Sequence, residues 1–184
     1  LLVALEYTGS GFTSSSYSGS IPSSSNDYGR LKLYVDSLNT PALAFTTDIY
    51  LPFFNGNWWS VMISSGSGQD GMENGYQIYA ADKIYNGNDG FKINHIQSSS
   101  IANNGHLWGS NAAHPLGAYL GVSASVGGNY THPGFSGSFQ EYRFYNTQLS
   151  ESAFRDYVMN PLSIEGNGID SSPSQLAFRA PLGS

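Results

Sequence analysis

Several segments of the chain alternate apolar and polar residues, which is the pattern of a β-strand with one buried face. Between Arg30 and Asp36, for example, Leu31, Leu33 and Val35 alternate with more polar neighbours. The pattern predicts strands at Leu2–Tyr7, Arg30–Asp36, Leu43–Phe54, Trp58–Ser64, Gly75–Ile84, Phe91–Ile96, Tyr119–Val126 and Leu176–Phe178. A further strand is predicted around Glu141–Phe144. The chain is therefore expected to be mainly β, with about ten short strands.

Turn-forming residues separate these predicted strands. Asn55-Gly56 predicts a tight hairpin that joins Leu43–Phe54 to Trp58–Ser64, because both central positions of such a turn favour positive φ. Residues 85–90, YNGNDG, predict a second turn, between Gly75–Ile84 and Phe91–Ile96.

One segment has helical spacing instead. Phe154, Tyr157 and Val158 recur at the period of an amphipathic helix, and Ser150 can accept hydrogen bonds from the free N–H groups of a first turn. Asn160-Pro161 cannot continue a helix. The sequence therefore predicts one short helix at Ser150–Met159.

The strand before this helix carries Tyr142 and Phe144 on one face and Glu141 and Arg143 on the other. The whole strand-turn-helix unit resembles the C-terminal signature of laminin-G-like domains, which belong to the concanavalin A-like lectin/glucanase superfamily. The matching positions are Gly137, Phe139, Glu141, Tyr142, Arg143, Phe144, Tyr145, Asn146, Leu149 and Ser150. The resemblance implies an all-β, antiparallel two-sheet jelly-roll sandwich with one short C-terminal helix. It speaks to fold more than to function.

The 184 residues suffice for one sizeable core. We expect the sandwich over residues 1–160, and over residues 161–184 an extended segment that packs on it or leads into a longer polypeptide. Because the chain begins with Leu1 and its last segment directly succeeds a strand-like run, we expect it to be a piece of a longer protein. The segment from Met159 onward is similar to the segments that come after such domains in phage and other viral structural proteins.

Composition and charge exclude some functions and favour others. Only 11% of the residues are charged and 22 are Gly, which favours many turns. The seven Lys and Arg residues are scattered and the net charge is −6, so nucleic acids and anionic membranes are disfavoured as partners. No apolar run approaches the length that membrane insertion requires. The absence of Cys excludes a disulfide framework and a thiolate nucleophile.

Catalysis is not expected. Glucanases of the same superfamily place carboxylates at E-x-D-x-x-E or E-x-D-x-E spacing on one strand, and the chain has no such spacing. Glu141 is interpreted as a structural partner of Arg143. The side chains that could imitate a polysaccharide lyase are interpreted as ordinary strand residues; they are Gln77, Tyr79, Lys83 and His95.

The resemblance also raises the question of Ca²⁺, which laminin-G-like and pentraxin-like relatives often bind. Ca²⁺ takes six to eight oxygen ligands. Two Gly-containing loops, residues 68–74 and 86–90, offer Asp70, Glu73 and Asp89 as candidate ligands. Gly, Asn and Asp are equally common in ordinary hairpin loops, so the turn interpretation stays open.

A glycan site needs a stacking aromatic side chain beside polar groups. Trp108 lies in a polar loop and is the first candidate, with His106 and Asn111 beside it. The alternative is that Trp108 folds back and caps the sandwich. Trp58 and Trp59 are adjacent on a strand, so only one of them can enter the core. Trp59 and Tyr130 complete the candidate ligand-binding residues.

The sequence thus favours a non-catalytic carbohydrate-binding or adhesion module of a larger surface or virion structural protein. We expect it outside the cell or on a virion, with a cell-surface glycan or other domains of the same polypeptide as partners. Two alternatives stay open: a glycosidase or polysaccharide lyase on the same jelly roll, and a purely structural assembly domain.

Overall fold

The computed structural model of the protein describes residues 2–7, 27–35, 45–66, 75–102, 124–126, 130–132, 134–163 and 173–181. These residues form ten strands, one α-helix and one turn of 3₁₀-helix. The strands are β1 (Leu2–Tyr7), β2 (Gly29–Val35), β3 (Phe45–Leu51), β4 (Trp59–Gly66), β5 (Gly75–Tyr85), β6 (Phe91–Ala102), β7 (Ala124–Val126), β8 (Tyr130–His132), β9 (Glu141–Tyr145) and β10 (Leu176–Pro181); the helix is α1 (Glu151–Met159) and the 3₁₀ turn is Pro173–Gln175.

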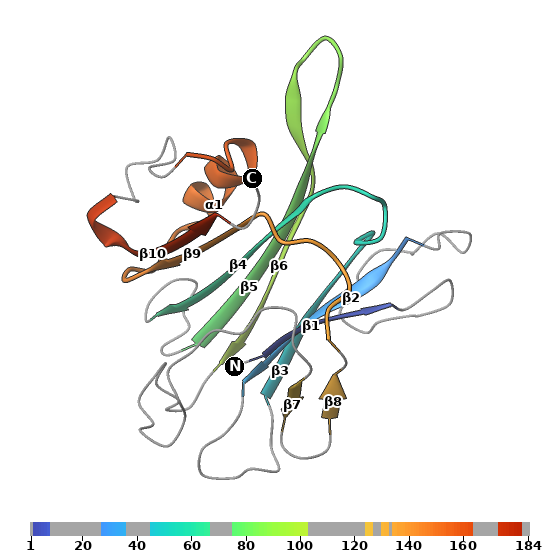
Figure 1. Ribbon diagram of the computed structural model, residues 1–184, viewed down its shortest axis with the longest axis vertical. Helices are drawn as coiled ribbons and strands as arrows, with labels where there is room; N and C mark the ends of the chain where they lie inside the picture. The colour runs from blue at the N-terminus through green and yellow to red at the C-terminus, as the bar shows by residue number, and fades with distance from the viewer. Residues whose placement is uncertain are drawn as a thin grey trace.

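Two three-stranded antiparallel sheets form the body of the molecule, one in the order β1-β2-β3 and the other in the order β4-β5-β6 (Figure 1). Their inward side chains form one core. Leu33 and Ile49 enter it from the first sheet and Ile78 from the second, and none of the three is exposed to solvent. The two-residue period that predicted these strands therefore identifies their buried faces correctly.

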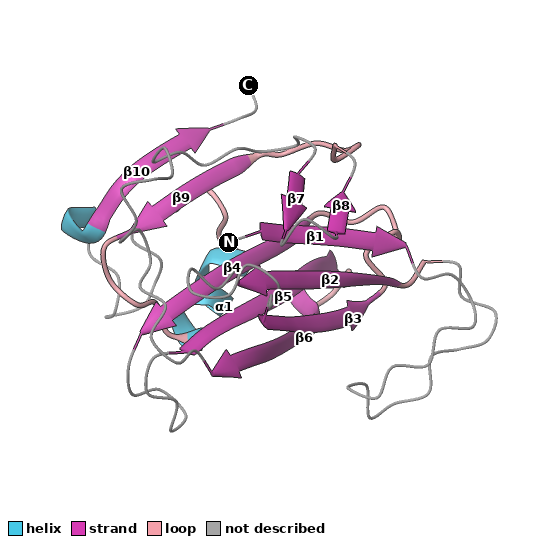
Figure 2. Ribbon diagram, turned by 90° about the horizontal axis from the view of Figure 1, so that it is seen from below, coloured by secondary structure: helices cyan, strands magenta, loops and turns pink. Residues whose placement is uncertain are grey.

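Strand β5 is buried on both faces. Tyr76, Ile78 and Ala80 face the first sheet, whereas Tyr79 and Ala81 face α1 on the opposite side. Figure 2 shows the helix behind the β4-β5-β6 sheet. A strand covered on both sides is apolar along most of its length, which explains why the alternation is weak in GYQIYAAD.

The predicted helix is confirmed. Ser150 is its N-cap, since the Ser150 Oγ accepts a hydrogen bond from the Ala153 backbone N–H at 3.2 Å. Phe154 and Val158 are buried against β5, whereas Tyr157 is half-buried. Lys83 donates to the Met159 carbonyl at 2.8 Å and so places a cation at the negative end of the helix.

The predicted Asn55-Gly56 hairpin is wrong. Strand β3 pairs with β2, and β4 pairs with β5, so the connection between β3 and β4 crosses from one sheet to the other. Pro52 cannot donate to a strand ladder, and Phe53 is buried in the core, so β3 ends before Asn55 is reached. Gly56 does take a positive φ of 82°, as expected for a turn. The second predicted turn is confirmed, because β5 and β6 pair across residues 86–90.

The mainly β, antiparallel architecture with one short helix is confirmed, but the described strands divide into four sheets rather than two. Strands β9 and β10 form a two-stranded sheet beside α1, and β7 and β8 form another (Figure 1). Among the described residues, no helix is long and apolar enough to cross a bilayer.

Candidate functional site

A group of polar and aromatic side chains lies where the β3–β4 connection passes the β4-β5-β6 sheet. Strand pairing aligns Trp59 of β4, Asp82 of β5 and His95 of β6 in one row. The β5–β6 ladder shifts its register directly after Asp82, so the regular pairing is interrupted at this point. We call Asn55, Asn57, Trp58, Trp59, Asp82 and His95 the crossover cluster.

Asp82 is the centre of the crossover cluster and has no solvent-exposed surface. Its Oδ1 accepts hydrogen bonds from the backbone N–H of His95 and from the ring Nδ1 of His95, both at 2.9 Å. Its Oδ2 accepts from the side-chain amides of Asn57 at 2.8 Å and Asn55 at 3.3 Å. The carboxylate is therefore satisfied from both the neighbouring strand and the crossover.

These contacts decide the ionisation of Asp82. Burial alone would raise the pKa of the carboxyl group, but the hydrogen bonds from Asn57 and His95 outweigh burial and hold the pKa below its ordinary value. Since four donors already occupy the two oxygens, Asp82 acts as a fixed acceptor that holds the crossover. The arrangement also fixes His95, whose Nδ1 must carry its proton to donate to the carboxylate.

The crossover itself is held in shape by Asn55. The Asn55 Oδ1 accepts from the Asn57 backbone N–H at 2.9 Å, which forms an Asx-turn around Gly56. The same oxygen accepts from the Trp59 Nε1 at 3.3 Å. Both ends of the Asn55 amide are thus used, and the segment that carries Trp58 is positioned before any ligand arrives.

The two adjacent tryptophans point in different directions, as the sequence predicts. Trp59 packs on the core, lies 4.7 Å from Phe53 between ring centroids and stacks on the His95 ring at 5.8 Å. Trp58 is 60% exposed. An exposed indole, on a segment whose backbone is held by hydrogen bonds of Asn55 and Asn57, suits stacking against a flat apolar face such as that of a sugar ring.

Only part of the predicted site can be compared with this cluster. Trp59 belongs to it, but it is half-buried and packs on the core, whereas its neighbour Trp58 is exposed. The other predicted ligand residues and metal ligands lie outside the described residues, with the exception of Tyr130 and Asp89; they are His106, Trp108, Asn111, Asp70 and Glu73. Tyr130 begins the short strand β8.

Asp89 is an exposed turn residue. The Asp89 carboxylate accepts a hydrogen bond from the Asn86 side chain at 2.9 Å, so it closes the turn between β5 and β6. In the described part of the chain, no three acidic or histidine side chains gather as metal ligands would. The Ca²⁺ site stays a prediction.

The Glu141–Arg143 contact exists, with 3.0 Å between the Glu141 Oε1 and the Arg143 Nε. Their side chains are only 13% and 10% exposed, because this face of β9 is turned toward the end of α1. Arg143 also donates to the Ser163 carbonyl at 2.6 Å and to the Pro161 carbonyl. Arg179 of β10 is a second partner of Glu141 that the sequence did not suggest.

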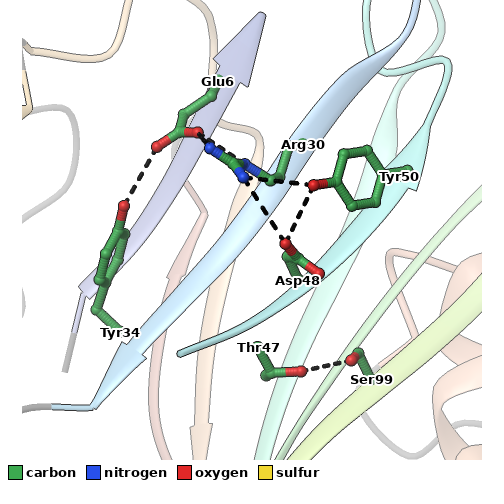
Figure 3. A network of polar contacts seen from close by, with 7 residues as sticks. All are labelled: Glu6, Arg30, Tyr34, Thr47, Asp48, Tyr50 and Ser99. Atoms are coloured by element: carbon green, nitrogen blue, oxygen red, sulfur yellow. Dashed lines mark hydrogen bonds and ion pairs between the residues drawn. The ribbon is translucent and has the colours of Figure 1, made fainter. Parts of the chain in front are cut away.

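A second polar network lies on the face of the β1-β2-β3 sheet opposite to the core, where Tyr34 and Tyr50 are nevertheless buried (Figure 3). Arg30 is its centre: its Nε donates to Glu6 at 2.8 Å and its Nη1 to the Tyr50 hydroxyl at 3.3 Å. Tyr34 donates to Glu6 at 3.2 Å, and Asp48 accepts from Tyr50 at 3.2 Å.

Two carboxylates on one sheet face invite comparison with a glycosidase, in which the environment raises the pKa of one of them. Burial would raise the pKa of Glu6, but the hydrogen bond and the charge of Arg30 outweigh it and lower that pKa. Glu6 is therefore held ionised and is poorly suited to act as a general acid. The network ties three strands together.

The four residues compared with a polysaccharide lyase, Gln77, Tyr79, Lys83 and His95, do not gather in one site. Tyr79 and Lys83 face α1, where the Tyr79 ring packs 5.6 Å from that of Phe154 and Lys83 caps the helix. Strand pairing places Gln77 on the same face of β5 as Tyr79, whereas His95 belongs to the crossover cluster. A shallow depression between α1 and β6 offers about 250 Å³, part of it open to solvent, which is below the usual size of a ligand pocket.

Comparison of the chain with protein-family models, with curated proteins and with solved structures gave no match in any of the three. The likeness to laminin-G-like domains consequently depends on short sequence motifs, chiefly Gly137–Ser150.

Proposed function

We propose that the protein is a non-catalytic carbohydrate-binding module, built on a sandwich of the jelly-roll type. The observation that carries the proposal is the exposed Trp58, whose chain neighbours Asn57 and Trp59 are hydrogen-bonded to Asp82 and Asn55. As its setting we propose the surface of a larger extracellular or virion structural protein. This setting is supported by two resemblances: that of the Gly137–Ser150 motif to laminin-G-like domains, and that of the segment from Met159 onward to segments of phage and other viral structural proteins.

Three properties of the crossover cluster favour binding over catalysis. Trp58 provides a wide apolar face, on which a sugar ring can stack with a gain of about 1 kcal/mol. The Asn55 and Asn57 amides fix the loop, so that little conformational entropy is lost on binding. The buried Asp82 has its acceptor positions filled, and its lowered pKa does not suit a general acid.

The test is a glycan array followed by calorimetry on the best ligand, for the natural protein and for Trp58→Ala. We expect Trp58→Ala to weaken binding about tenfold, the equivalent of one lost stacking contact. The matched control is Phe178→Ala, which removes an aromatic ring that is 54% exposed on β10. Equal affinity of the natural protein and Trp58→Ala would show that the binding site does not include Trp58. Failure to bind any glycan would refute the proposal of a carbohydrate-binding module.

The loop site predicted at Trp108 is a separate part of the same proposal. The Trp108→Ala variant, measured on the same ligand, distinguishes the two locations. If Trp108→Ala loses binding and Trp58→Ala keeps the affinity of the natural protein, the site is assigned to residues 103–111. The array is repeated with Ca²⁺ and with a chelator. Binding that requires Ca²⁺ and is lost in Asp89→Ala supports the predicted metal ligands.

A structural assembly domain is a second candidate, favoured by aromatic pairs on the surface. Tyr7 contacts Phe54 and Tyr85 contacts Phe91, and all four rings are between 43% and 66% exposed. Exposed aromatic pairs are common where proteins associate. Light scattering over a range of concentrations tests this candidate. A monomer at every concentration argues against self-assembly.

A further inference from the structure

The positive charges of the chain are few, and its own carboxylates engage every arginine. The sequence has four arginines and three lysines, and all seven lie in described residues. Arg30 pairs with Glu6, Arg143 and Arg179 share Glu141, and Arg155 pairs with Glu151. The net charge of the chain is −6.

These contacts leave Arg30 and Arg143 little capacity for a charged ligand. Arg143 directs all three nitrogens inward, to Glu141 and to the carbonyls of Pro161 and Ser163. Arg30 uses its Nε and Nη2 on Glu6 and its Nη1 on Tyr50. A carboxylate or sulfate that entered either site would have to displace a partner that is already bonded.

None of the three lysines belongs to the segment that connects β3 with β4. Lys83 donates to the end of α1, and Lys32 lies over the Tyr34 ring at 4.9 Å on the outer face of the first sheet. Lys92 is exposed on β6, three positions before His95. Residues 52–60, which include Trp58, contain neither lysine nor arginine.

We infer that the glycan bound at Trp58 is uncharged, and that polyanionic glycans such as uronates, sulfated chains and sialic acid polymers are not ligands. This inference rests on the proposed function and specifies its ligand class. The desolvation cost of an anionic sugar is best offset by a nearby Lys or Arg, and residues 52–60 have neither. A protein of net negative charge also repels a polyanion as a whole.

The test compares neutral with acidic polysaccharides at neutral pH, with a chelator present so that no Ca²⁺ bridges two anions. The neutral probes are dextran, laminarin and yeast mannan, and the acidic probes are heparin, polygalacturonate and polysialic acid. We expect binding of at least one neutral probe, with an affinity that changes less than about twofold between low and physiological salt. Trp58→Ala should reduce that affinity, and Phe178→Ala should leave it unchanged.

The outcomes separate the inference from the proposed function. Retention on heparin or another acidic probe, with affinity that falls steeply as salt rises, would overturn the inference while the binding module survived. Binding of none of the six probes, nor of any glycan on the array, would overturn the proposed function and the inference with it. Neutral binding that is insensitive to salt and depends on Trp58 supports both.

Discussion

At the scale of single residues, the most constrained group is the Asp82 carboxylate. The alternation of residues in β5 does not predict the role of Asp82, which simply follows Tyr79-Ala80-Ala81 in the sequence. An acid inside an apolar strand is a signal that a buried polar group needs donors. The donors themselves could not be inferred, because Asn57 lies 25 residues away along the chain.

Asp82→Ala is expected to destabilise the protein by about 3 kcal/mol, since it removes four hydrogen bonds to a buried carboxylate, one of them from the backbone N–H of His95. Urea unfolding monitored by tryptophan fluorescence measures the change. Asp89→Ala is the control, because its exposed carboxylate makes a single turn hydrogen bond; we expect a cost of about 1 kcal/mol or less. Equal losses in the two variants would show that Asp82 does not anchor the crossover.

At the scale of elements, the sequence predicts those features that depend on residues close together in the chain, such as helix caps and turns. The Ser150 cap, the spacing of Phe154 and Val158 and the turn at residues 86–90 all depend on neighbours within a few positions, and all are confirmed. Asn55-Gly56 shows the limit of such signals. The dipeptide favours a turn, but whether the turn joins paired strands or two different sheets depends on partners such as β2 that lie far away in sequence.

The packing of α1 can be tested through Phe154. Phe154→Ala should cost about 3–5 kcal/mol, because it removes a buried ring from the layer between the helix and β5. Thermal melting followed by circular dichroism records the loss as a lower midpoint. Ser152→Ala, on the exposed side of the same helix, should melt within a few degrees of the natural protein. A Phe154→Ala protein with an unchanged midpoint would contradict the packing.

At the scale of the whole molecule, three carboxylates with lowered pKa lie in different parts of the fold. They are Glu6 in β1, Asp82 in β5 and Glu141 in β9. For Glu141, the Arg179 hydrogen bond lowers the pKa, burial opposes it, and Arg143 adds to the lowering. The shared strand face of Glu141 and Arg143 predicted their contact. Neither the contact of Arg179 with Glu141 nor that of Arg30 with Glu6 could be predicted in this way, because both join residues far apart in the sequence.

These groups make stability depend on pH in one direction. In the unfolded chain they bind protons near the ordinary values of 3.8 for Asp and 4.5 for Glu, whereas the folded protein holds them ionised to lower pH. The free energy of unfolding should therefore be nearly constant above about pH 6 and fall as the pH drops through and below those values.

Urea titrations between neutral and acidic pH measure this slope. Glu141→Gln should make the pH dependence of the free energy of unfolding less steep, because it removes one of the three carboxylates with lowered pKa. The control Glu151→Gln removes an exposed helix carboxylate that is paired with Arg155, and we expect a smaller effect on the slope. An acid slope that is the same in Glu141→Gln and in the natural protein would contradict the assigned ion pair.

The burial of β5 on both faces has a further consequence for amide hydrogen exchange. Amide protons between Tyr76 and Ala81 are covered by the first sheet on one side and by α1 on the other, so their exchange with solvent deuterium should require opening of the entire core. Their opening free energy should then equal that of global unfolding. Exchange in the turn at residues 86–90, at the exposed tip of the same hairpin, should be orders of magnitude faster.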